Sequence, residues 1–259
     1  MALPQNASRT HRPRMILVDD NIRDVGGHYF ELATLLLSGA DELGFKNVMG
    51  THATFDDPSV VPDTWQVKPT FQTRRLVRWS LGVDGDSTLR RDMDGRPIGG
   101  STWQNLLARI KDRAVPPQKR PRRMLEQWSD DLCRVLTEVR PTSADCLLIN
   151  TGDDFAMLGL ADAMKRMSLA SMRIDIIFHF ALHEVGQSDR DSRLKQIGRQ
   201  IRSAMNELRP HHVHLHATTD SLAEQLRATE CGTPITSIPY PTRHRTVSRD
   251  ASTQPIKAV

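Results

Sequence analysis

The first stretch with chemical potential is a glycine loop close to the N-terminus. Gly26, Gly27 and His28 follow a polar segment that begins directly after the apolar run at residues 15–18. Glycines allow backbone N–H groups to approach a ligand, and a helix that starts behind them directs its positive end toward an anion. The motif leaves two interpretations open: the loop binds a ligand, or it only turns the chain from a strand into a helix.

A second group of candidate residues follows the strongest strand pattern of the chain. His179, His183 and Glu184 lie where the β-branched and aromatic run at residues 174–180 passes into a polar segment. A histidine at such a strand end can hold or move a proton beside a sugar or a phosphate. The alternative is a structural histidine with a satisfied partner, and both interpretations stay open.

Polar residues also follow two other apolar runs. Asn150 ends the run that starts at residue 146, Asp153 and Asp154 come next, and Thr218 follows the run at residues 212–217. Such residues either cap the next helix or contact a ligand, and capping is the simpler interpretation for the aspartates. As ligand contacts, Asp153 and Thr218 would join His183 and Glu184 in holding a substrate.

Three histidines alternate along one expected strand. His212, His214 and His216 would share one face of that strand, because side chains repeat with a period of two. Three imidazoles on one face can bind zinc, but a strand near the edge of a sheet also tolerates a histidine face. No carboxylate ligand is identifiable beside them, so the sequence predicts no metal site.

These candidates are separated by alternating strand and helix patterns. The expected strands are residues 15–18, 47–52, 146–150, 174–180, 212–217 and 235–238, and the expected helices are residues 29–43, 124–139, 154–167, 194–208 and a short helix ending at residue 227. This alternation predicts an α/β fold, a Rossmann-like parallel sheet with helices on both faces. Ligands bind such sheets at the carboxyl ends of the strands, where the candidate residues fall.

The chain is expected to form one domain with a loose segment at each end. Residues 1–13 predict a flexible arm, residues 14–241 the Rossmann-like domain, and residues 242–259 a polar tail. Within the domain, residues 54–123 are rich in proline, glycine and arginine. They predict an irregular basic insertion with one helix at residues 102–113, either functional or only a solvated excursion.

The composition is that of a soluble globular chain. Of its 259 residues 38% are hydrophobic, the formal net charge is +4, and the three cysteines are widely spaced. No run is apolar and long enough to span a membrane, and such cysteine usage fits a reducing compartment, so the cytoplasm is the expected location. Aromatic residues make up only 5% of the chain, which offers few stacking platforms and argues against nucleic acid as a partner.

Four short segments, in this order, resemble the N-terminal half of retaining glycosyltransferases with the two-domain GT-B fold. They are the loop at residues 26–29, the strand that ends at Asn150, the strand that ends in His179, and the turn at residues 216–223, which precedes a linker-like segment at residues 238–241. The resemblance implies an acceptor-side domain of an enzyme that transfers a sugar from a nucleotide-sugar to a hydroxyl acceptor, without a separate cofactor.

The resemblance also assigns roles to residues of this sequence. It places Gly26, Gly27 and His28 near the phosphates of the nucleotide-sugar, and we take His179, Asn150 and His28 as the candidate catalytic residues. Members of that family often carry a histidine where Asn150 stands, and an amide cannot perform acid/base chemistry near neutral pH.

Two further departures concern the end of the chain. The linker-like segment lacks an Asn-Gly pair, and no second Rossmann half follows residue 241. The expected partner is therefore a second Rossmann domain on another chain, or a second copy of this one. Two other functions stay open: a non-catalytic binding or interaction module on a degenerate GT-B half, and a phosphate or nucleic-acid binder that uses the Arg-rich insertion.

Overall fold

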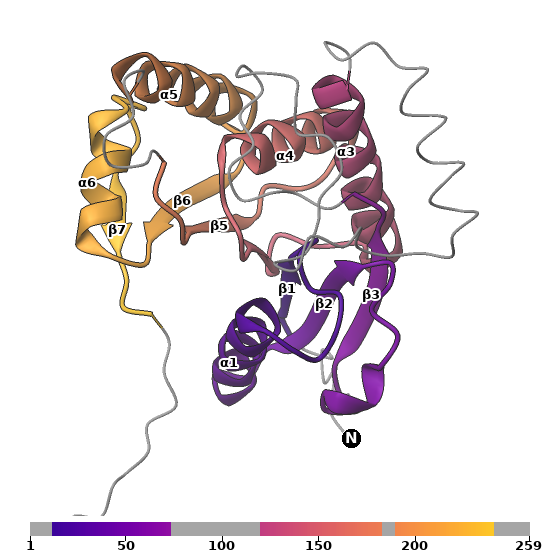
Figure 1. Cartoon of the computed structure of the whole chain (residues 1–259). Coiled ribbons are helices and arrows are strands. Elements are labelled where there is room, and N and C mark those ends of the chain that lie inside the picture. The colour runs from indigo at the N-terminus through magenta and orange to yellow at the C-terminus, as the bar shows by residue number, and fades with distance from the viewer. Residues whose placement is uncertain (1–11, 74–119, 183–189, 241–259) are drawn as a thin grey trace, which may run out of the picture.

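A single sheet of seven parallel strands forms the centre of the computed structural model, which describes residues 12–73, 120–182 and 190–240 (Figure 1). The strand order is β3-β2-β1-β4-β5-β6-β7. The strands are β1 Arg14–Val18, β2 Lys46–His52, β3 Gln66–Phe71, β4 Cys146–Ile149, β5 Arg173–Phe178, β6 His212–Ala217 and β7 Ile235–Ser237. Every described pairing is parallel, as the sequence predicts.

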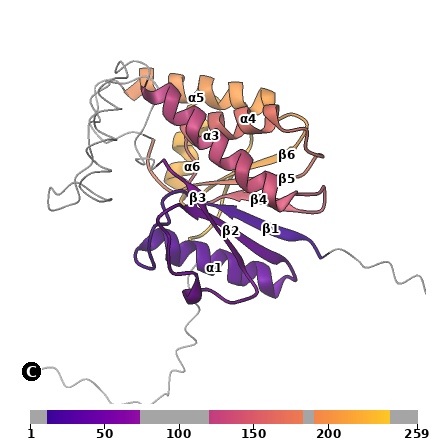
Figure 2. The same ribbon diagram turned by 90° about the vertical axis from the view of Figure 1, so that its right-hand side faces the viewer.

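Helices cover both faces of this sheet. They are α1 His28–Glu42, the 3-10 helix η1 Pro58–Val60, α3 Arg120–Val139, α4 Asp154–Arg166, α5 Arg190–Glu207 and α6 Asp220–Ala228. Figure 2 shows α1 on one face and the layer of α3, α4 and α5 on the other. The predicted Rossmann-like α/β fold is therefore confirmed. Within the described residues, no helix has the length and apolar character needed to cross a membrane.

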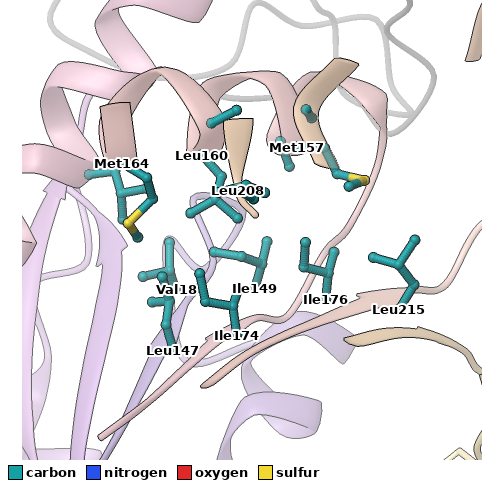
Figure 3. Close-up of a cluster of buried hydrophobic side chains, with 14 of the residues drawn as sticks. Val18, Leu147, Ile149, Met157, Leu160, Met164, Ile174, Ile176, Leu208 and Leu215 are labelled. Atoms are coloured by element: carbon teal, nitrogen blue, oxygen red, sulfur yellow. The ribbon is translucent and has the colours of Figure 1, made fainter. Parts of the chain in front are cut away.

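Each face of the sheet has its own hydrophobic core. The larger core lies under α3 to α6, where strand residues such as Ile149 and Ile174 point toward Leu160 and Met164 of α4 (Figure 3). The smaller core lies between α1 and the first strands and includes Leu17 and Leu37. Alternate residues of one strand enter different cores, as expected when a parallel sheet is buried on both faces.

Strand β3 departs from the sequence interpretation. The sequence predicts an irregular insertion at residues 54–123, yet residues 66–71 within this range form an edge strand parallel to β2. Lys68 and Pro69 interrupt the apolar alternation of this strand, and only Phe71 is buried. Proline is tolerated at a sheet edge, where its missing N–H costs no ladder bond. The helix expected at residues 102–113 lies outside the described residues.

Helix ends follow the predicted capping residues closely. Asp153 caps α4 by accepting a hydrogen bond of 2.6 Å from the backbone N–H of Ala156. Thr219, one residue after Thr218, caps α6 through the N–H of Leu222 at 3.1 Å. These side chains satisfy backbone donors that a helix start otherwise leaves unpaired.

Two helical glycines allow the packing to be tested. A β-carbon at Gly198 in α5 would overlap the carbonyl oxygen of Thr229, whereas one at Gly39 in α1 would meet nothing within 4 Å. We expect Gly198→Ala to lower the free energy of unfolding in urea by about 1–3 kcal/mol, because the backbone of Gly198 or of Thr229 must move to make room for the methyl group. Gly39→Ala is the matched control and should raise it by up to ~1 kcal/mol through helix propensity. Equal effects of the two substitutions would contradict this packing.

Candidate functional site

The candidate site lies where the strand order reverses. β1 pairs with β2 on one side and with β4 on the other. The chain passes from β1 to β2 and from β4 to β5, so the two connections run in opposite directions across the sheet. We call the place between the ends of β1 and β4 the switch point. Open α/β sheets bind ligands in the crevice beside the carboxyl ends of such strands. Here that edge carries the glycine loop after β1 and the Asn150–Asp154 turn after β4.

A buried carboxylate fixes the ends of both strands. Asp19 is fully buried, and its Oδ2 accepts hydrogen bonds from Asn150 Nδ2 and Thr151 Oγ1, both at 2.8 Å. Its Oδ1 accepts the backbone N–H of Asn21 at 2.9 Å. Its described bonds hold the switch point together, and they orient the Asn150 side chain.

His179 is held against the same turn. Its Nε2 lies 2.6 Å from the backbone carbonyl oxygen of Asn150, which can only accept, so Nε2 carries the proton and Nδ1 carries the lone pair. Nδ1 is buried and has no hydrogen-bond partner among the described residues, and the same holds for Asn150 Oδ1. Burial, with the nearby His28 adding to it, lowers the pKa of His179 to about 4. The imidazole is therefore neutral at pH 7.

The glycine loop leads into the start of α1. Gly27 is the N-cap with φ 86° and ψ 165°, a conformation that essentially only glycine adopts, and α1 has no side-chain cap. A β-carbon at Gly27 would point into open space, whereas Gly26 has no positive φ and only ordinary contact with Asp24. The structure therefore gives Gly27, and not Gly26, a conformational need for glycine. His28 is the exposed first residue of the helix.

Aromatic rings gather beside this helix start. The ring centroids of His28 and Tyr29 are 3.9 Å apart, and Phe180 lies 5.9 Å from His28 and 6.2 Å from Tyr29. Tyr240, after β7, lies 6.0 Å from His179 and is 43% exposed. Sequence reasoning missed this surface. The available signal was that both tyrosines of the chain stand near these loop ends.

The remaining candidates have different placements. Thr218 is buried, and its hydroxyl donates a hydrogen bond of 3.3 Å to the backbone carbonyl oxygen of Phe178. His183 and Glu184 lie outside the described residues. Asp154 is the buried first residue of α4, where burial and the neighbouring Asp153 raise its carboxyl pKa to about 7. The structure thus brings Gly27, His28, Asn150, His179 and the two aspartates to one edge of the sheet.

The three alternating histidines lie elsewhere, on the α1 side of β6. His216 Nε2 bonds Asp175 Oδ1 at 2.7 Å, and Asp175 also accepts from Arg173 at 2.7 Å and from Cys146 at 3.2 Å. Burial raises the pKa of the Cys146 thiol to about 12, so the thiol is not a nucleophile. Across residues 12–73, 120–182 and 190–240, no group of three His, Cys, Asp or Glu side chains could hold a metal ion.

Comparison with known proteins adds no relative. A scan against protein-family models and a search of curated proteins both find no match to this chain. The function must therefore be argued from the geometry of the switch point itself.

The protonation of His179 provides a direct test of this geometry. Histidine in water titrates near pH 6.5, and we expect the ring signals of His179 in NMR to titrate with a midpoint of about 4. Because the unfolded chain then binds this proton more tightly than the folded chain, stability should fall as pH decreases from about 6.5 toward 4. A His179 midpoint between 6 and 7 would show that the ring is solvated and not held by Asn150.

Proposed function

We propose that this chain is the acceptor-side half of a glycosyltransferase, which transfers a sugar from a nucleotide-sugar to a hydroxyl acceptor. A second Rossmann-like domain would supply the facing half of the cleft. The observation that carries the proposal is that hydrogen-bond donors and hydrogen-bond acceptors lie side by side at the switch point. The start of α1 offers donors, and the neighbouring Asn150 and His179 offer neutral acceptors.

The start of α1 supplies the part of the site that suits a phosphate. Backbone N–H groups in the first turn point out of the helix, and the helix dipole adds positive potential there. Gly27 leaves the approach to these groups free of side-chain atoms. A nucleotide-sugar carries its diphosphate between the nucleoside and the sugar, so a phosphate held here would place the sugar beside the neighbouring strands.

Asn150 and His179 supply the part that suits a sugar. Asn150 Oδ1 and His179 Nδ1 are buried acceptors without a donor among the described residues, and leaving such atoms unpaired costs free energy. Sugar hydroxyls are donors, and they are neutral like the His179 ring. The Phe180 ring lies 5.9 Å from that of His28, the first residue of α1, and 6.2 Å from that of His179, so the two halves of the site adjoin.

The aromatic rings add a surface on which a sugar or base can lie. Tyr29 and Phe180 are partly buried beside the helix start, and Tyr240 is exposed at its rim. Flat rings bury apolar area with little loss of side-chain freedom, and a tyrosine keeps a polar tip for a hydroxyl. The exposed ring of Tyr240 offers a face on which a sugar or base can stack, which supports a binding role for this end of the sheet.

The chemistry of the proposed reaction limits what these residues contribute. The bond between the sugar C1 and the phosphate oxygen breaks, a bond from C1 to the acceptor oxygen forms, and the acceptor's proton passes to the leaving phosphate oxygen. His179 can accept a hydrogen bond or a proton at Nδ1, whereas Asn150 can only orient a hydroxyl. Their contribution is thus to hold the sugar while the helix start stabilises the leaving phosphate.

Calorimetry with UDP-glucose and GDP-mannose tests this function, with UDP as the sugar-free probe. We expect Gly27→Ala to weaken nucleotide-sugar binding by about tenfold, since a side chain at this backbone conformation must rotate the N–H groups away from the ligand. The same substitution costs about 1–2 kcal/mol of stability through backbone strain.

Gly44→Ala is the matched control for that experiment. Gly44 follows the other end of α1, also has a positive φ of 91° and also faces open space. It should lose similar stability and keep wild-type affinity. Equal affinities of the two variants, or no binding of any of the three compounds to the wild-type chain, would overturn the proposed function. Binding without sugar transfer, even with a facing domain added, would favour a binding module instead.

A further inference from the structure

The short segment that follows β7 carries an aromatic side chain to the candidate site. The backbone N–H of Ile238 donates a hydrogen bond of 2.9 Å to the carbonyl oxygen of Ala217, the last residue of β6. The Ile238 side chain packs against the smaller core, beside residues of α1. Two residues later comes Tyr240, so its place at the edge of the sheet is set by a backbone bond and by core packing.

The two tyrosines of the chain contact different parts of the candidate site. The ring centroid of Tyr240 lies 6.0 Å from that of His179, and the two ring planes meet at 72°. The ring contacts of Tyr29 are instead with His28 and Phe180, at the start of α1. Tyr29 therefore belongs to the part of the site proposed to hold a phosphate, and Tyr240 to the part proposed to hold the sugar.

An aromatic face beside neutral acceptors suits a sugar ring. A hexose carries hydroxyl groups around its rim and C–H bonds on its faces, so its rim can donate hydrogen bonds while one face packs on a flat ring. Asn150 Oδ1 and His179 Nδ1 are the acceptors, and Tyr240 is 43% exposed. Burial raises the pKa of the Tyr240 hydroxyl above its usual value of 10, so the three groups are neutral at pH 7.

We propose that Tyr240 packs against the sugar ring of the nucleotide-sugar and thereby determines specificity for the sugar, an inference that rests on the proposed function. One C–H face of the sugar lies on Tyr240, and its hydroxyl groups donate to Asn150 and His179. The class of sugar that fits this place is a neutral hexose. A sugar acid does not fit, because the lone pairs of both acceptors oppose its carboxylate.

The ring signals of His179 test the underlying contact without any ligand. An aromatic ring shifts the resonances of nuclei close to it, so Tyr240→Ala should move the His179 ring signals in NMR at pH 7. Leu43→Ala is the matched control, because Leu43 is also an exposed apolar side chain but follows the other end of α1. It should leave these signals in place. Unmoved His179 signals in Tyr240→Ala would overturn the inference.

Calorimetry with UDP-glucose, GDP-mannose, UDP and UDP-glucuronate tests the assignment to the sugar. We expect Tyr240→Ala to weaken binding of UDP-glucose and GDP-mannose about five- to tenfold and to leave the affinity for UDP unchanged, because UDP lacks the transferred sugar. Tyr240→Phe keeps the ring and should lose less affinity than Tyr240→Ala. Leu43→Ala should bind all four compounds as the wild type does, and the wild type should bind UDP-glucuronate no more tightly than UDP.

The outcomes separate this inference from the proposed function. An equal loss of UDP and UDP-glucose affinity in Tyr240→Ala would place the ring beside the nucleoside and overturn the inference. Unchanged affinities in that variant, or tighter binding of UDP-glucuronate than of UDP to the wild type, would overturn it as well. The proposed function would survive these results if Gly27→Ala still weakens nucleotide-sugar binding. No binding of any of the four compounds to the wild-type chain would overturn both.

Discussion

The carboxylate of Asp19 is the constraint on which the candidate site depends. It is fully buried at the end of β1 and is bonded to Asn150 and Thr151 at the end of β4, as well as to Asn21 in its own loop. Leaving a buried donor or acceptor unpaired costs on the order of 1–3 kcal/mol, so the loss of any one of these hydrogen bonds would weaken the junction. This bond set joins two strands whose last residues, Val18 and Ile149, are 131 residues apart in sequence.

The site follows from that junction step by step. Because Asn150 Nδ2 donates a hydrogen bond to Asp19, the amide group has a fixed orientation, and its Oδ1 points away from Asp19 as an acceptor. Because the Asn150 backbone is fixed, its carbonyl oxygen holds the proton of His179 on Nε2 and leaves the buried Nδ1 as an acceptor. One buried carboxyl group therefore sets the hydrogen-bonding character of Asn150 and His179, which is the preorganisation that a binding site requires.

The sequence predicts the fold better than the site. Apolar runs and helical stripes locate six of the seven strands, but β3 escapes because Lys68 and Pro69 break its pattern at a solvated edge. The strand-end rule correctly brings Asn150 and His179 to one edge. It cannot reveal that Tyr29 contacts Phe180, or that Tyr240 contacts His179, because these neighbours arise from packing between distant segments.

The central claim is that the switch point between β1 and β4 is the ligand site of this protein. Chemical-shift mapping of the labelled chain with GDP-mannose and UDP-glucose tests it most directly. The account predicts that the largest shifts fall on Gly27, His28, Asn150 and His179, at the carboxyl edge of the sheet. Shifts confined to the histidine face at residues 212–216, or the absence of any shift in the chain, would contradict it.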